Sequence, residues 1–179
     1  MVTTKDNKEL VTEALDHPNV QAFLRMIRYA EGTSGTDGYR TMFTGTLFSA
    51  PPWYHPNIIN EANGLRSTAA GAYQFLKSTW DILSESLGFN GDFKPGNQDL
   101  AAIELLRRRK ALDYVIDGDI RHAIYGVPIG LDDDENEIFK PNTGANKEWA
   151  SLPGSPYGQP VKTYAQIRNY YQNAGGALA

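Results

Sequence analysis

Cysteine is absent from the 179-residue chain, which excludes disulfide bonds and thiolate metal sites and fits folding in a reducing cytoplasm. The three histidines, His17, His55 and His122, lie far apart without the spacing of zinc ligands, so we expect no bound metal. An excess of charge of one sign is also missing. The formal net charge of −4 gives no general reason to expect nucleic acid or an anionic membrane as a partner.

Long apolar runs are missing as well. No stretch approaches the roughly 18 apolar residues that a membrane-spanning helix requires, and residues 1–20 show no apolar core of a secretion signal. The acidic run 132–137 lacks the glycine and glutamate that a calcium-binding EF-hand loop places at its sixth and twelfth positions, which favours a solvated loop. The basic run 107–110 is interpreted as a solvated helix face. We therefore expect neither membrane insertion nor a calcium site.

Apolar spacing and capping residues predict a mainly helical chain. Hydrophobic residues make up 41% and charged residues 21%, and the length suits a single domain spanning residues 1–179. Helices are predicted at 8–17, at 18–31 with Pro18 in the first turn and Gly32 after the end, at 80–88 with a Ser78–Asp81 capping box, at 98–117 capped by Asn97, at 120–126 capped by Asp119, and at 161–176 opened by Pro160.

Two regions interrupt the helical pattern. Residues 39–66 mix threonine, glycine, proline and aromatic residues, with β-like pieces at 40–43 and 47–48 and an Asn63-Gly64 turn signal, and predict a small β-rich subdomain. Residues 127–147 are acidic and rich in turn residues, and predict an exposed hairpin or loop. This pattern predicts an α+β fold in which the β-rich subdomain forms one side of a substrate cleft.

One charged residue lies on the apolar face of a predicted helix. Ile27 follows Leu24 by three residues and Glu31 follows Ile27 by four, so the three side chains share one side of the helix. Partial burial and the negative end of the helix dipole both raise the pKa of a carboxyl group there, as a general acid requires. The alternative is a helix-terminal glutamate that faces solvent, and these residues alone favour that alternative.

Five short motifs occur along the chain between about residue 23 and residue 176. They are "AEGT" with "DGY", "STAAGAYQFLKSTWD", "NQDLAAIELL", "IDGDIRHAI" and "EWASLPGSPYGQ". Their order and spacing resemble the phage lambda endolysin family, the lambda-type lytic transglycosylases, whose fold is lysozyme-like. The chain departs from that family in a shorter loop between Glu31 and Tyr39 and in an apparent surface insertion at residues 127–147.

The resemblance implies roles for individual residues. Glu31 corresponds to the catalytic acid of the family. Gln74 is implied to hydrogen-bond a sugar, Tyr73 to support the cleft wall, and Tyr157 to lie close to the catalytic glutamate. Ser67 and Thr68 are implied to line the same site. For Tyr73 the alternative is packing in the core, and for Gln74 it is a purely structural role.

The resemblance also implies a reaction. A lytic transglycosylase cleaves the β-1,4 bond between N-acetylmuramic acid and N-acetylglucosamine in peptidoglycan and forms a 1,6-anhydro ring, without a metal or cofactor. Asp37, the nearest acid after Glu31, is interpreted as a loop residue rather than a second catalytic carboxylate. The alternatives are a hydrolytic muramidase on the same fold and a non-catalytic wall-binding or tail module.

The resemblance also implies the partners and the location of the protein. Peptidoglycan glycan strands are the expected substrate, and the protein is expected to act as a monomer. By resemblance, it would accumulate in the host cytoplasm until a phage holin opens the inner membrane, and would then act on the wall in the periplasm.

Overall fold

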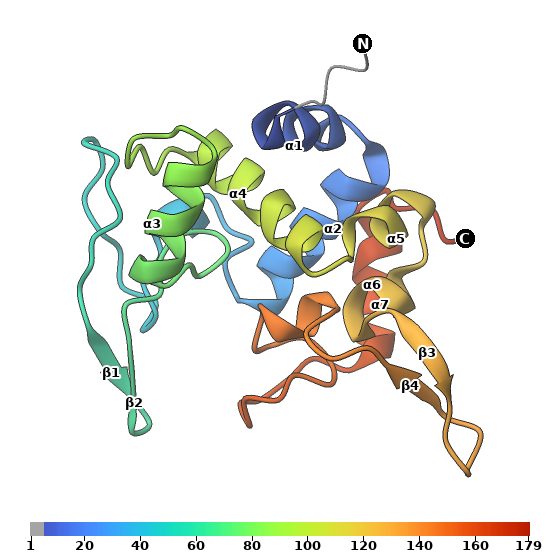
Figure 1. Cartoon of the computed structure of the whole chain (residues 1–179). Helices are drawn as coiled ribbons and strands as arrows, with labels where there is room; N and C mark the ends of the chain where they lie inside the picture. The colour runs from blue at the N-terminus through green and yellow to red at the C-terminus, as the bar shows by residue number, and fades with distance from the viewer. Residues whose placement is uncertain (1–5) are drawn as a thin grey trace.

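The computed structural model describes residues 6–179, which form a mainly helical molecule with two short antiparallel hairpins (Figure 1). The helices are α1 Asn7–Leu15, α2 Pro18–Ala30, α3 Lys77–Ser86, α4 Pro95–Arg108, α5 Leu112–Asp117, α6 Ile120–Tyr125 and α7 Tyr164–Asn173, with short 3-10 turns η1 Gly38–Arg40 and η2 Ala145–Lys147. The hairpins pair β1 Asn60–Ala62 with β2 Leu65–Ser67, and β3 Pro128–Leu131 with β4 Glu137–Phe139. Among the helices of residues 6–179, none is long and apolar enough to cross a membrane.

Helix α2 lies at the centre of the fold and contacts α1, α4, α5 and α7. Pro18 occupies its first turn, where a missing N–H costs nothing, and the imidazole of His17 accepts a hydrogen bond from the Asn19 amide at 3.2 Å. Phe23 and Ile27 are fully buried, and Phe23 meets the ring of Tyr171 on α7 edge-on. The buried face fixes α2 in the core, so its C-terminal end has a defined position.

In the β-rich segment, the predicted turn is present but the strands lie at other positions than predicted. The Asn63-Gly64 turn is confirmed: both residues have left-handed φ angles, +52° and +74°, as a tight hairpin turn requires. The predicted strands at 40–43 and 47–48 are reduced to single bridges such as Thr41 with Leu47, because Arg40 belongs to η1. Regular pairing occurs instead at β1 and β2.

Several helix boundaries differ from the sequence prediction. The expected helix 98–117 is broken at Lys110, whose φ of +59° is incompatible with a right-handed helix, and α4 begins at Pro95 rather than after Asn97. The Ser78–Asp81 capping box is wrong: α3 begins at Lys77, whose amide donates to Thr68 Oγ1 at 3.1 Å.

Helix α7 also begins later than expected, at Tyr164 rather than directly after Pro160. Its start is fixed by a capping box in which Thr163 and Gln166 bond each other's backbone amides. The prediction that Asp119 caps α6 is confirmed by a hydrogen bond from the His122 amide at 3.1 Å. Asp119 is thus confirmed as a helix cap, whereas Asn97 lies inside α4, and the first amide of α3 is bonded by Thr68 from outside the local sequence.

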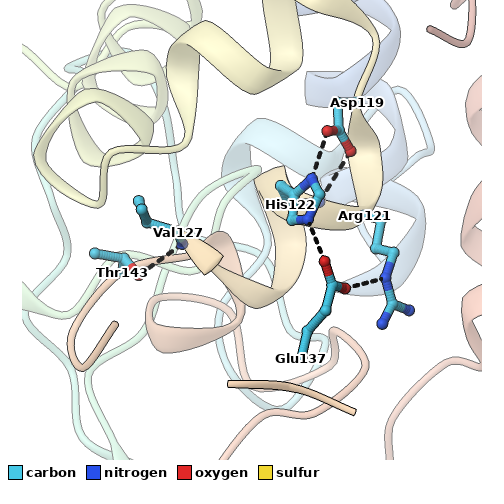
Figure 2. A network of polar contacts seen from close by, with 6 residues as sticks. All are labelled: Asp119, Arg121, His122, Val127, Glu137 and Thr143. Atoms are coloured by element: carbon cyan, nitrogen blue, oxygen red, sulfur yellow. Dashed lines mark hydrogen bonds and ion pairs between the residues drawn. The ribbon is translucent and has the colours of Figure 1, made fainter. Parts of the chain in front are cut away.

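The predicted hairpin within 127–147 is present as β3 and β4 and is fastened to α6 by a polar network (Figure 2). The His122 ring lies between Asp119 Oδ2 at 2.5 Å and Glu137 Oε1 at 2.9 Å, and Arg121 Nε donates to the other Glu137 oxygen at 2.8 Å. Burial lowers the pKa of His122, but the hydrogen bonds to the two carboxylates outweigh it and raise the pKa above its ordinary value. At the base, the Val127 amide donates to Thr143 Oγ1 at 3.0 Å.

The basic run 107–110 is not a plain solvated face. Arg107 and Arg108 both bind the carboxylate of Glu104, whose side chain is fully buried, at 2.7 and 2.8 Å. A buried carboxylate requires such partners because an unpaired charge in the interior is strongly destabilising. Within the described part of the chain, no group of three or more histidine, aspartate or glutamate side chains could hold a metal ion.

Candidate active site

Glu31 is the residue at which α2 ends. Its amide still donates to the Ile27 carbonyl at 2.9 Å, and Gly32 follows with a φ of +73°, which turns the chain away from the helix axis. The loop that follows is fixed by Thr33, which is buried and whose hydroxyl donates to the Ala72 carbonyl at 2.5 Å. The carboxyl group of Glu31 is therefore carried on a backbone that is fixed on both sides.

The environment of Glu31 raises its affinity for a proton. Burial is the dominant cause and raises the pKa of Glu31 above its ordinary value. Hydrogen bonds from the hydroxyl and backbone amide of Ser151 to the carboxyl group lower the pKa but do not cancel the effect of burial. A carboxyl group with a raised pKa can donate a proton closer to neutral pH, which is the property that a general acid needs.

Glu31 lines a cleft of about 420 Å³. Its lining comes from the end of α2, from β2 and residues 69–79, from Leu105 and Arg109 at the end of α4, and from residues 147–159, which start at the last residue of η2. These segments are far apart in the sequence: Figure 1 shows the β1–β2 hairpin at the left edge of the molecule and the segment after η2, in orange, below its middle. A volume of this size suits a small ligand or a few sugar rings.

The cleft brings together most of the residues that the sequence implied. The residues that line it are Glu31, Ser67, Tyr73, Gln74 and Tyr157. Thr68 does not line it, because its hydroxyl accepts the Lys77 amide at the start of α3. The side chain of Ser67 accepts the Ala69 amide at 3.0 Å, which fixes the wall just before the tight turn at 71–74.

Gln74 is held in a fixed orientation. Its Nε2 donates to the carbonyls of Thr41 and Gly71, both at 3.0 Å, and its backbone adopts a left-handed φ of +51°. A non-glycine residue in this conformation is strained, and the surrounding structure must hold it there. Because Nε2 is already used, the side-chain oxygen is the atom of Gln74 that remains to accept a hydrogen bond from a ligand.

The turn before Gln74 is held from behind by Gln98, which is fully buried. Its Oε1 accepts the Ala72 amide at 2.9 Å. Gly71 has a φ of +81°, and a Cβ atom there would lie 2.3 Å from Gln98 Oε1. Only glycine fits this position, both for its conformation and for the close approach of Gln98.

Tyr73 forms a wall that is tied to the core. Its side chain is 2% exposed, and its hydroxyl donates to Asp99 Oδ1 at 2.6 Å, where the hydroxyl of Tyr39 also donates at 2.8 Å. Burial, followed by the charge of Asp99, raises the pKa of Tyr73 well above its usual range, so the hydroxyl stays protonated as a donor. The indole of Trp149 donates to the Tyr73 carbonyl at 3.2 Å and joins the two walls of the cleft.

Tyr157 lies on the opposite wall and is 53% exposed. Its hydroxyl donates to the Lys147 carbonyl at 2.5 Å, which ties the loop after Trp149 to η2. Asp37, in contrast, does not line the cleft. It is exposed and forms an ion pair with Arg40 at 2.7 Å.

Two features of the site were missed by the sequence analysis. Ser151, the partner of Glu31, lies 120 positions away and has no local pattern to announce it. Glu148 is a second acid in the cleft, where it forms an ion pair with Arg109 at 2.6 Å. The motif "EWASLPGSPYGQ" contains both residues, but it indicated only Tyr157.

Comparisons with known proteins agree with this architecture. The solved structure of bacteriophage lambda lysozyme complexed with a chitohexasaccharide matches with a TM-score of 0.73 and 32% identity, covering 90% of this chain and 97% of that one. A second structure of lysozyme from bacteriophage lambda matches with a TM-score of 0.70 over the same shares. The fold and cleft therefore define a lysozyme-like α+β protein, as the sequence predicted.

The family follows from the sequence matches. The Endolysin family model matches residues 21–128 and 134–178, and the chain belongs to this family. Endolysins of Escherichia phage lambda and Escherichia phage P2 are 31% and 33% identical, over 88% and 91% of this chain and 92% and 96% of their own lengths. The interruption of the family match at 129–133 falls in the β3–β4 hairpin.

Proposed function

We propose that the protein is a lytic transglycosylase that cleaves the β-1,4 bond between N-acetylmuramic acid and N-acetylglucosamine in bacterial peptidoglycan. The observation that carries the proposal is Glu31, a partly buried carboxyl group of raised pKa in a cleft. Membership of the Endolysin family, and the chitohexasaccharide bound to the related lambda lysozyme, support a glycan strand as the substrate.

In the proposed mechanism, Glu31 first protonates the glycosidic oxygen. The acetamido group of the muramic acid stabilises the resulting oxocarbenium-like centre. Glu31, now ionised, takes the proton from the C6 hydroxyl of the same sugar, and that oxygen bonds to C1 to close the 1,6-anhydro ring. One carboxyl group thus acts as acid and then as base, and the intramolecular attack gains from proximity.

Further residues of the cleft have defined parts in the proposal. The side-chain oxygen of Gln74 accepts a hydrogen bond from a sugar, and Tyr73 maintains the wall against which the sugar lies. Ser67 and Tyr157 line the same cleft. Thr68 contributes indirectly, through the start of α3, rather than by contact with the sugar.

A hydrolytic muramidase is the second candidate, and the position of Glu148 is the observation that favours it. Most glycosidases use two carboxyl groups, and Glu148 lines the same cleft as Glu31. Its ion pair with Arg109, however, occupies one of the two carboxylate oxygens of Glu148. A non-catalytic wall-binding module is disfavoured because it has no need for a buried acid in the cleft.

The masses of the released muropeptides test the proposal. A transglycosylase releases anhydro-muropeptides, which are lighter by one water than the products of hydrolysis. Products that carry only reducing ends would contradict the transglycosylase mechanism and support the muramidase. Glu31→Gln should lower the rate by about 100-fold to 10,000-fold, the usual contribution of a general acid. A Glu31→Gln protein that lysed walls at the normal rate would remove this residue from its role.

We also propose that the protein accumulates in the host cytoplasm, passes the inner membrane only when a holin opens it, and acts as a monomer on the wall in the periplasm. Expression without a holin should then leave cells intact until the membrane is permeabilised. Spontaneous lysis of such cells would contradict the proposed route.

A further inference from the structure

The charged side chains of the cleft do not balance one another. The charged residues that line it are Glu31, Arg66, Arg109, Lys147 and Glu148. Arg109 and Glu148 neutralise each other in their ion pair at 2.6 Å, and Arg109 is further held by the Asn142 carbonyl at 3.2 Å. Glu31 is neutral when it is ready to donate its proton. The cleft that awaits substrate therefore carries an excess of positive charge from Arg66 and Lys147.

Lys147 is the cation without a partner in the cleft. In the part of the chain that the structure describes, no hydrogen bond or ion pair involves its amino group. Its backbone, in contrast, is firmly held: its amide donates to the Gly144 carbonyl at 3.2 Å, and its carbonyl accepts the hydroxyl of Tyr157 at 2.5 Å. A charge on a fixed backbone in a cleft costs less conformational entropy to engage than one on a mobile loop.

Arg66 is the second cation and comes from the opposite side. It belongs to β2, on the hairpin that Figure 1 shows apart from the segment around η2. Its side chain is 69% exposed and forms an ion pair with the equally exposed Glu61, in which Arg66 Nε and Glu61 Oε2 lie 3.8 Å apart, too far for a hydrogen bond. Such an exposed and distant pair contributes little, so Arg66 remains available to another anion.

In peptidoglycan, the proposed substrate, the free anionic groups lie on the peptide stem and not on the sugars. The N-acetylated sugar rings are neutral, and in intact peptidoglycan the lactyl carboxyl group of muramic acid is used in an amide bond to the peptide stem. The free carboxylates belong to the amino acids of that stem. Neutral sugars give no reason for a lysine without a partner and a weakly paired arginine in the cleft, whereas carboxylates do.

We propose that Lys147, with Arg66 across the cleft, forms a subsite that binds a free carboxylate of the peptide stem. The inference rests on the proposed function and adds a substrate preference to it: the enzyme distinguishes peptide-bearing strands from strands whose carboxylates are masked. The interaction acts mainly on substrate binding, so it changes KM more than kcat.

The test compares two forms of one substrate. Peptidoglycan is first acetylated on its free amino groups, and one half is then amidated on its carboxyl groups, which leaves the sugars unchanged. Wild-type protein should show a kcat/KM about threefold to tenfold lower on the amidated form, as expected for a partly exposed charge pair. Lys147→Gln should show the same loss on the unamidated form and no further loss on the amidated form, and Lys147→Arg should restore the preference.

Lys140→Gln is the matched control, because Lys140 is an exposed lysine outside the cleft and its loss changes the net charge equally. This variant should behave as the wild type on both substrates. The preference of the wild type should also shrink as ionic strength rises.

Three results would overturn the inference. The first is a wild-type protein that is indifferent to amidation. The second is a Lys147→Gln protein that loses activity equally on both forms, which would indicate contact with the sugars or a structural role. The third is a Lys147→Gln protein that loses as much activity on amidase-treated strands, which lack the peptide stem and carry only the lactyl carboxylate. That result would show that Lys147 does not act on a carboxylate of the stem. A wild-type protein that released nothing from any substrate would instead overturn the proposed function itself.

Discussion

Burial raises the pKa of Glu31, and the hydrogen bond from the Ser151 hydroxyl lowers it. The variant Ser151→Ala tests the balance between these two effects on the pKa. Removing the hydroxyl takes away a donor that stabilises the ionised carboxylate. A hydrogen bond to a charged group contributes about 1.5–3 kcal/mol. The backbone amide of Ser151 remains, and the hydroxyl also contacts the protonated acid, so a net difference near the lower limit, about 1.4 kcal/mol, is expected. That difference corresponds to about a tenfold higher proton affinity of Glu31.

The assay is the pH dependence of kcat/KM for wall cleavage. Because Glu31 must be protonated in the free enzyme to act as an acid, its pKa sets the alkaline limb of the profile. Ser151→Ala should move this limb to higher pH, and Ser151→Thr, which keeps a hydroxyl, should restore its position. A purely structural role for Ser151 would lower activity at every pH without moving the limb.

Ser155→Ala is the matched control. This serine lies in the same segment, and its buried hydroxyl has no hydrogen-bond partner within residues 6–179. The same change of side chain at this position should therefore leave the profile where it is. The reasoning would be refuted if Ser151→Ala left the alkaline limb unchanged or moved it to lower pH.

Two further predictions concern the walls and the hairpin. Gly71→Ala should destabilise the fold by about 2–4 kcal/mol, because residue 71 has a left-handed φ and the added Cβ would lie 2.3 Å from Gln98. The melting temperature measures this loss. Gly35→Ala is the control: its Cβ would meet nothing within 4 Å, so the melting temperature should stay nearly unchanged. Because the pKa of His122 is raised in the folded protein, its contribution to stability is fully present below about pH 6.5 and is lost as pH rises through the raised value. Amide hydrogen exchange in β3 and β4, corrected for intrinsic rates, should therefore become faster across that range in the wild type. It should not do so in His122→Gln. Equal pH dependence in both proteins would contradict this role of His122.

The sequence predicted those parts of the site that depend on local patterns. Helical spacing located α2 and showed that Glu31 shares its apolar side, and the Asn63-Gly64 pair identified the turn of the β1–β2 hairpin. These features depend on residues within a few positions of one another, where backbone geometry dictates which side chains meet. The assignment of Glu31 to catalysis needed the family resemblance, because a lone glutamate at a helix end is more often solvated.

Contacts between distant segments could not be predicted. Thr68 was expected to line the cleft but accepts the amide of Lys77, and Ser151 reaches Glu31 across 120 positions. The break between α4 and α5 was also missed, because Lys110 carries no mark of a left-handed residue and only tertiary packing imposes one there. In each case the deciding partner lies on another element, and the alternation of polar and apolar residues holds no information about it.

The position of Glu31 between two independently held segments explains how one carboxyl group can serve twice in the proposed reaction. Burial against the core favours the protonated form, which the first step needs, whereas the donors of Ser151 on the opposite wall favour the ionised form that this step produces. Stronger burial without the donors would hinder transfer of the proton to the glycosidic oxygen, and stronger donors without burial would leave the group ionised before the substrate arrived. Because the opposing effects come from different walls, the acid strength of Glu31 depends on how closely residues 147–159 approach α2, and substitutions in that wall should change the pH profile even where they touch no sugar.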